Sequence, residues 1–226
     1  MMMDKKIFVA CDVSSQEEIL DLLSKIHNEI SGIKIGLQYI TRHSTKEIKE
    51  LSKFNKPIFY DGKFFDIKNT LVESIKSLKN LNVDYATVHL LNGLDALKAA
   101  NQAADEINLN LLGVSVLTSF ADEDLKNLGF SNNVENQVKK LIEIAMEAKL
   151  YGVICSPLEI KMIKEIAPNL KCFTPGIRNA DIKDEQKRTM SAKEAIKEGS
   201  DCLIIGRPIT KGNPKENIKK ILSSID

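Results

Sequence analysis

Five charged residues of this sequence fall inside or directly after short apolar runs, where buried strands are expected: Asp12, Lys34, Asp61, Lys63 and Asp66. Lys34 is the least ordinary of them, because it stands between Ile33 and Ile35, and a lysine in a buried strand is rare unless it is paired. One interpretation is structural: Asp12 and Asp61 are helix caps or turn residues, and Lys34 forms a salt bridge with one of them. The other is an alternating Lys/Asp array, in which the charges keep one another ionised and aimed at a substrate.

Two segments in the last quarter of the chain each contain a glycine close to an arginine. They are Thr174-Pro175-Gly176-Ile177-Arg178 and Ile205-Gly206-Arg207-Pro208. Each follows an apolar run, so the glycines allow the backbone to approach a ligand, and Arg178 or Arg207 supplies a bidentate cation. The repeated pattern predicts a phosphate site. The alternative interpretation is that each glycine is a turn residue and each arginine a surface residue.

The elements that must hold these residues repeat along the whole chain as a short β-branched run, a polar turn and an amphipathic stretch. The predicted strands are Ile7–Cys11, Ile33–Gly36, Ile58–Tyr60, Tyr85–His89, Leu111–Val116, Gly152–Cys155, Lys171–Thr174 and Cys202–Ile205. Their near-continuous apolar character indicates parallel strands buried on both faces. We therefore predict one α/β domain over residues 1–226, a (β/α)8 TIM barrel. A doubly wound sheet is the alternative, but no G-x-G-x-x-G follows the first run.

Helical periodicity fills the segments between the strands. Ser14 and Glu17 have the spacing of a capping box ahead of an apolar face that starts at Ile19. Similar patterns predict helices over Ile67–Leu81, Leu94–Ile107, Leu158–Ile166 and Glu216–Ser223. Two connections, around Thr118–Asn133 and Thr174–Met190, are longer than packing requires, and such loops commonly build active sites at the carboxyl ends of barrel strands.

Composition narrows the class of protein. The 226 residues carry 32 Lys+Arg and 31 Asp+Glu, a formal net charge of +1, so bulk charge gives no reason to expect nucleic acid as a partner. No apolar run approaches the roughly 18 residues that span a bilayer. We therefore expect a cytoplasmic protein with no membrane partner. The four cysteines form no CxxC pair and are interpreted as reduced core thiols, and no histidine has metal-ligand spacing, so no metal site is expected.

The segment Asp61-Gly62-Lys63-Phe64-Phe65-Asp66-Ile67-Lys68-Asn69-Thr70 resembles the D-x-K-x-x-D-I-x-x-T signature of orotidine 5′-phosphate decarboxylases. The resemblance extends to Asp12, the Lys34 strand, the Leu117-Thr118-Ser119 turn, Gln186 and both glycine-arginine segments. It implies a homodimeric barrel that converts orotidine monophosphate to UMP without metal or cofactor.

The same resemblance assigns roles to individual residues. Lys63 is the expected proton donor, Asp61 the carboxylate beside the departing CO2, and Lys34 the lysine that orients them. Asp66 would be the fourth catalytic member, reaching with Thr70 into the neighbouring subunit's site. Asp12, Lys34 and Asp66 are expected to hold ribose hydroxyls. The remaining expected substrate contacts are Thr118 and Ser119 at the pyrimidine and Pro175, Arg178, Gln186, Gly206 and Arg207 around the phosphate.

Three departures from the family pattern concern packing and leave the charged residues intact: Gly62, Phe65 and the segment Leu90-Leu91-Asn92-Gly93. Two alternative functions remain open. A magnesium-dependent phosphosugar lyase of the same suprafamily shares the D-x-K-x-x-D motif, but Lys34 stands where such an enzyme needs a carboxylate, and a lysine would repel Mg²⁺. A barrel that only binds a nucleotide has no need of a charged array that is costly to bury.

Overall fold

A computed structural model of the chain describes residues 7–178 and 188–225. Its eight strands form a closed barrel in chain order, with β8 paired to β1 and every pairing parallel. The strands are β1 (Ile7–Ala10), β2 (Gly32–Gly36), β3 (Ile58–Phe64), β4 (Tyr85–His89), β5 (Asn110–Val114), β6 (Gly152–Ile154), β7 (Lys171–Thr174) and β8 (Cys202–Ile205). The predicted (β/α)8 barrel is therefore confirmed.

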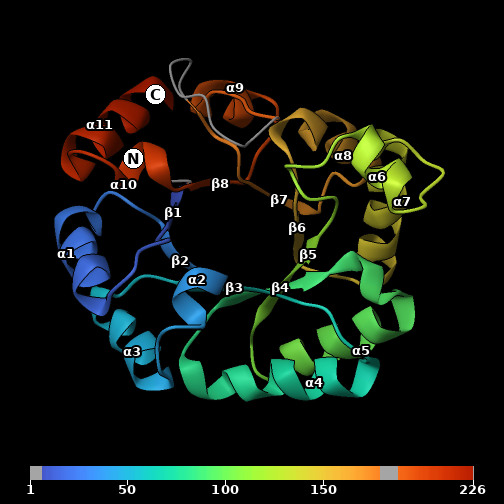
Figure 1. The fold of residues 1–226 in the computed structure, drawn as a ribbon, viewed down its shortest axis with the longest axis horizontal. Helices are drawn as coiled ribbons and strands as arrows, with labels where there is room; N and C mark the ends of the chain where they lie inside the picture. Colours follow the sequence, from blue (N-terminus) through green and yellow to red (C-terminus); the bar gives the residue numbers. More distant parts are fainter. Residues whose placement is uncertain (1–6, 179–187, 226) are drawn as a thin grey trace.

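The helices surround the strands as an outer ring (Figure 1). They are α1 (Gln16–Ile26), α2 (Leu37–Ile40), α3 (Thr45–Glu50), α4 (Lys68–Ser77), α5 (Leu94–Asp105), α6 (Asp122–Asn127), α7 (Val134–Glu147), α8 (Ile160–Ile166), α9 (Ala192–Lys197), α10 (Arg207–Thr210) and α11 (Pro214–Ile225). Short 3₁₀ segments lie at Leu51–Phe54, Leu78–Leu81, Leu90–Asn92 and Pro157–Glu159. The predicted helices are present, and the one expected over Ile67–Leu81 ends as a 3₁₀ turn.

The capping box of α1 lies one residue later than expected. Ser15, and not Ser14, is the N-cap: its hydroxyl accepts the Glu18 N–H, and the Glu18 carboxylate accepts the N–H groups of both serines. Glu18 satisfies two donors at once, so this register leaves fewer orphan amides than a box closed by Glu17.

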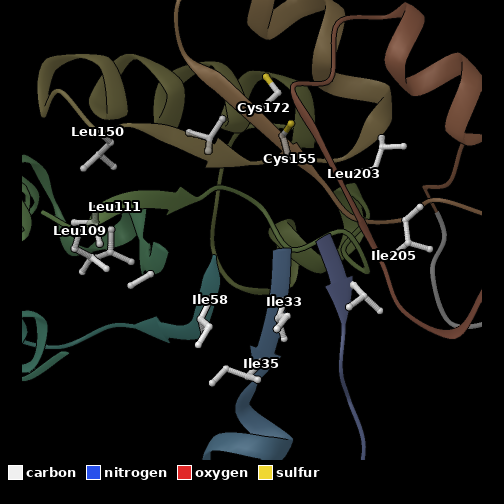
Figure 2. Packing of buried hydrophobic residues seen from close by; sticks show 14 of the residues in the cluster. Ile33, Ile35, Ile58, Leu109, Leu111, Leu150, Cys155, Cys172, Leu203 and Ile205 are labelled. Atoms are coloured by element: carbon white, nitrogen blue, oxygen red, sulfur yellow. The ribbon is translucent and has the colours of Figure 1, made fainter. Parts of the chain in front are cut away.

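Strand residues alternate between two apolar layers. Ile33 and Ile35 of β2 point outward and join the large core under the helices, which Figure 2 shows together with Cys155 and Cys172. All four cysteines are free and buried, as expected. Each fully buried aliphatic side chain of this layer stabilises the fold by about 1.5–3 kcal/mol.

The inward-facing layer closes the barrel below the cavity. Phe8, Phe59 and Phe173 contact one another edge to face, with ring centroids 5.9–6.3 Å apart. The strand alternation that turns Ile33 and Ile35 outward turns Lys34 inward, where its register partner on β3 is Phe59. Lys34 is thus buried beside apolar rings, where its ion pairs are poorly screened by water.

Candidate active site

A cavity of about 290 Å³ opens at the carboxyl ends of the strands. Its lining combines charged side chains with an apolar wall: Ala10, Asp12, Lys34, Asp61, Lys63, Val114, Val116, Leu117, Thr118, Ile154, Pro175, Gly176, Arg178, Ile204, Gly206 and Arg207. The cavity therefore unites four of the five charged residues of the predicted array, Asp12, Lys34, Asp61 and Lys63, with both glycine-arginine segments, although Lys63 and the first of these segments lie more than 100 residues apart in the chain.

Asp61 is the centre of the charged array. Its Oδ2 atom lies 2.8 Å from Lys63 Nζ and 3.4 Å from Lys34 Nζ. Lys34 Nζ also lies 3.5 Å from Asp12 Oδ1. The side chains of Lys34 and Asp61 are only 8% and 11% exposed, whereas that of Lys63 is 35% exposed and faces the cavity. The two lysines and two aspartates thus form one continuous network, with Lys63 as its accessible cation.

At Lys34 and Asp61, the two buried members of the array, the combined effect of nearby charges and hydrogen bonds on the pKa outweighs the effect of burial. Burial alone would raise the pKa of Asp61, but the charges of Lys34 and Lys63 and hydrogen bonds from Lys63 and Thr87 hold that pKa below its ordinary value. Burial lowers the pKa of Lys34, but the charges of Asp61 and Asp12 overcome it and leave the pKa raised. Both groups are therefore ionised at neutral pH.

Two glycines make room for this network. A β-carbon at Gly36 would lie 3.0 Å from Asp12 Oδ1 and 3.1 Å from Lys34 Nζ, so a larger residue would crowd the ion pair. A β-carbon at Gly62 would lie 2.8 Å from the Tyr60 ring, which stacks on Phe64 with ring centroids 5.8 Å apart. Gly62, a departure from the expected pattern, therefore allows two aromatic rings to stack beside the array.

The strand carrying Asp61 and Lys63 is longer than predicted and irregular. β3 continues to Phe64, and its register against β4 shifts between Tyr60 and Phe64. Lys63 has a left-handed backbone with φ of +47°, which is uncommon for a residue with a side chain. Its N–H donates to Thr87 Oγ1, and the Thr87 hydroxyl donates to Asp61 Oδ1. Sequence reasoning did not single out Thr87, because an apolar strand gives no sign of which face its one threonine occupies.

The segments after β7 and β8 also border the cavity. Pro175, Gly176 and Arg178 come from the first loop, and Gly206 and Arg207 from the second. The base of the first loop is closed by two backbone hydrogen bonds, from Met190 N–H to Gly176 O (3.2 Å) and from Arg178 N–H to Met190 O (3.0 Å). Two arginines and two glycines thus border the cavity from segments that follow the neighbouring strands β7 and β8, and their binding of a phosphate stays a prediction.

The turn after β5 faces the same cavity through Leu117 and Thr118. Arg188 braces this turn: its Nη2 donates to Leu117 O (2.9 Å), its Nε to Thr118 O (3.5 Å), and its Nη1 pairs with the buried Glu159 carboxylate. Burial raises the pKa of Glu159 and the Arg188 charge opposes that shift. No sequence signal marked Arg188, since its partners lie about 30 and 70 residues away.

Some predicted site residues do not border the cavity. Asp66, Thr70 and Ser119 are exposed and absent from its lining. Asn92 fixes the segment that leads to Asp66: its amide oxygen accepts the Asp66 N–H, and its amide nitrogen donates to Phe64 O and His89 O. Gln186 lies outside the described residues. Asp66 and Thr70 were expected to reach the site of a neighbouring subunit, so their absence from the cavity of their own chain leaves that prediction untested.

In residues 7–178 and 188–225, no three His, Cys, Asp or Glu side chains gather in an arrangement suited to a metal ion. None of the helices in those ranges has the length and apolar character needed to cross a membrane.

The family model for orotidine 5′-phosphate decarboxylase / HUMPS matches residues 5–221. The chain belongs to this family. An orotidine 5′-phosphate decarboxylase of Wolbachia pipientis subsp. Culex pipiens (strain wPip) is 37% identical over 221 residues, covering 97% of this chain and 98% of the relative. One from Legionella pneumophila (strain Corby) is 37% identical over 229 residues, covering 99% and 100%.

A solved structure supports the same membership in the orotidine 5′-phosphate decarboxylase / HUMPS family. The crystal structure of orotidine 5′-phosphate decarboxylase from Lactobacillus acidophilus matches with a TM-score of 0.85 and 31% identity, covering 99% of this chain and 100% of the other. The family resemblance drawn from the Asp61–Thr70 motif, and with it the expectation of an enzyme, is confirmed.

Proposed function

We propose that this chain decarboxylates orotidine 5′-monophosphate to UMP, the last step of pyrimidine nucleotide synthesis, without a metal ion or organic cofactor. The observation that carries the proposal is the geometry of Lys63. Its ammonium group faces the cavity, 2.8 Å from the Asp61 carboxylate, and two arginines border the same cavity from the segments after β7 and β8. A nucleotide with a charged base substituent at one end and a phosphate at the other matches this distribution of charge.

The reaction breaks the bond between the pyrimidine ring and its carboxylate. The bonding electron pair stays on the ring carbon, CO2 leaves, and a proton from Lys63 Nζ forms the new C–H bond. Lys63 then regains a proton from solvent. A cation held beside that carbon before charge develops there lowers the barrier, and such preorganisation is usually the largest catalytic contribution.

The other members of the array keep Lys63 charged and aimed. Asp61 stands beside the departing carboxylate, and Lys34 balances the Asp61 charge from below. Asp12 and Lys34 are the proposed partners of ribose hydroxyls, with Thr118 at the pyrimidine. Arg178, Arg207 and the glycine-containing loops are the proposed phosphate clamp, and binding energy gained there offsets the work of placing a second carboxylate near Asp61.

Lys34 separates this proposal from a magnesium-dependent phosphosugar lyase of the same family. An ammonium group 3.4 and 3.5 Å from the two carboxylates already occupies the charge position that Mg²⁺ would need. This contact supports a reaction that uses lysine cations in place of a divalent metal.

We further propose a homodimer with shared sites. Asp66 and Thr70 are exposed next to Phe65 and Ile67, which are 63% and 74% exposed, so the segment after β3 presents apolar side chains beside two polar ones. A two-fold axis through this surface would bury Phe65 and Ile67 and carry Asp66 and Thr70 toward the partner's array. The four reduced thiols support a reducing, cytoplasmic setting.

The direct test is to mix purified, EDTA-treated protein with orotidine monophosphate and follow the loss of its ultraviolet absorbance. We expect turnover to UMP, equal with and without added Mg²⁺. A Lys63→Ala preparation purified in parallel controls for contaminating enzyme. Absence of turnover contradicts the proposed reaction, and turnover only after Mg²⁺ is added supports the phosphosugar alternative.

A further inference from the structure

The irregular part of β3 is opposite a single residue of β4. Tyr60 pairs with Ala86 and Phe64 pairs with Val88, so Asp61, Gly62 and Lys63 together face Thr87. Such bulges re-aim side chains next to active sites and interrupt the regular ladder of backbone hydrogen bonds. Here the bulge contains both residues that form the shortest ion pair of the array.

The Thr87 hydroxyl joins the two ends of this bulge. It accepts the Lys63 N–H at 2.8 Å and donates to Asp61 Oδ1 at 2.9 Å. Thr87 is fully buried, and a hydroxyl is one of the few neutral groups that donates and accepts through the same atom. Because Asp61 Oδ1 is engaged by Thr87, Oδ2 is the oxygen that receives Lys63 and Lys34.

The backbone of Lys63 needs such support. Its left-handed conformation, with φ of +47°, is unfavourable for residues other than glycine, asparagine and aspartate. It persists only where surrounding contacts hold it. The hydrogen bond to Thr87 Oγ1 is a contact of this kind, made directly to the amide of the strained residue.

We propose that Thr87 is a positioning residue, whose hydroxyl holds the Lys63 backbone and the Asp61 carboxylate in the relative geometry that aims the Lys63 ammonium into the cavity. This inference depends on the proposed function in one respect: it takes Lys63 as the catalytic group. Removing the hydroxyl leaves the part-buried Lys63 amide and a buried Asp61 carboxylate oxygen each short of one partner, so the bulge relaxes and Lys63 Nζ shifts. Displacements of about 1 Å at a reacting group cost rates on the order of 100-fold.

Two substitutions separate the hydroxyl from the methyl group of Thr87. Thr87→Val keeps the shape and loses both hydrogen bonds, and Thr87→Ser keeps the hydroxyl and loses the methyl group. We expect Thr87→Val to lower kcat by about 100-fold with KM changed less than about threefold, and Thr87→Ser to recover kcat to within about fivefold of the wild type. Ser200→Ala, which removes another buried hydroxyl, bonded to Thr174 and Cys202, controls for general destabilisation.

Crystal structures of Thr87→Val and of the wild type make the test independent of turnover. We expect the Lys63 φ angle in the variant to leave the left-handed region and the Lys63 Nζ to Asp61 Oδ2 distance to lengthen. If the wild type does not decarboxylate the substrate, the proposed function fails while this structural comparison still decides the role of Thr87. Should Thr87→Val not fold, Thr87→Cys replaces it, since a thiol is a weak donor and acceptor. Unchanged Lys63 geometry, or equal kcat losses in the valine and serine variants, overturns the proposal.

Discussion

In the half of the barrel mouth formed by β1–β4, the polar groups of the cavity are Lys34, Asp61 and Lys63, which stand on strands, and Asp12, which follows β1, and ion pairs link all four. In the half formed by β5–β8, they belong to loops: the Leu117–Thr118 turn, the segment after β7 and the start of α10. The first half is braced from within, by Asp61 and Thr87, and the second by Arg188, which reaches across from one loop to another.

Under the proposed function, this difference separates catalytic groups held on strands from substrate-binding groups held on loops. Bond breaking demands geometry held to a fraction of an ångström, which strands with locked side chains provide. Binding a flexible nucleotide needs groups that close around it after entry, which loops provide. We therefore expect substitutions in the first half to affect kcat and those in the second half to affect affinity.

The largest expected effect is that of Lys63→Ala. Loss of the cation beside the developing carbanion should lower kcat by roughly 1,000-fold or more, whereas affinity for UMP should change by less than about tenfold. Turnover assays and calorimetric titration with UMP measure the two quantities. Lys68→Ala, which removes an exposed lysine paired with Asp95, is the matched control. Equal losses of turnover and of UMP affinity would make Lys63 a binding residue and erase the contrast between the two halves.

The second prediction tests whether the strand half is completed by a partner chain. Lys63→Ala and Asp66→Ala proteins, each inactive alone, should regain activity when mixed and allowed to exchange subunits. Each heterodimer then has one intact and one doubly damaged site, and about half of wild-type activity is expected. Native mass spectrometry of differently tagged chains verifies the heterodimers. Verified heterodimers without activity would place every catalytic group within one chain.

Arg207→Ala should have a smaller effect, confined to phosphorylated ligands. Loss of a charge-assisted pair weakens their binding by about 2–4 kcal/mol, and kcat at saturation should change far less. Titrations with UMP and with uridine, on the wild type and the variant, separate the two contributions. Arg42→Ala at an exposed helix end serves as a control for removal of a surface arginine. A loss of affinity as large for uridine as for UMP would mean that Arg207 does not contact the phosphate.

The smallest expected effect is a dependence of folding stability on pH. The folded-state pKa of Asp61 lies below its unfolded value, so its charge contributes stability that is present above the unfolded pKa, near 4, and is lost as pH falls through the folded pKa. The free energy of unfolding of the wild type minus that of Asp61→Asn should therefore decrease between pH 6 and pH 3. Urea denaturation at both values measures this difference. A difference that stays constant or grows toward pH 3 would contradict a paired, ionised Asp61.

Much of the fold was predictable from the sequence because it follows from local chemistry. Parallel strands buried on both faces require apolar runs, and strand alternation forces Lys34 inward once Ile33 and Ile35 point outward. The polar residues that follow such runs must lie at the carboxyl ends of the strands, so Asp12, Asp61, Lys63, Arg178 and Arg207 were identifiable as candidate site residues.

Other features depend on contacts between distant segments and were decided only by the tertiary structure. Thr87 meets Lys63 because of a register shift between β3 and β4, and Arg188 meets Leu117 and Glu159 through loop packing. The apolar wall of the cavity, which includes Val114, Ile154 and Ile204, consists of the same residue types as the core. Residue type alone therefore does not distinguish the wall from the core. Hydrophobic pattern and residue type determine which elements form, whereas register and packing determine which side chains meet.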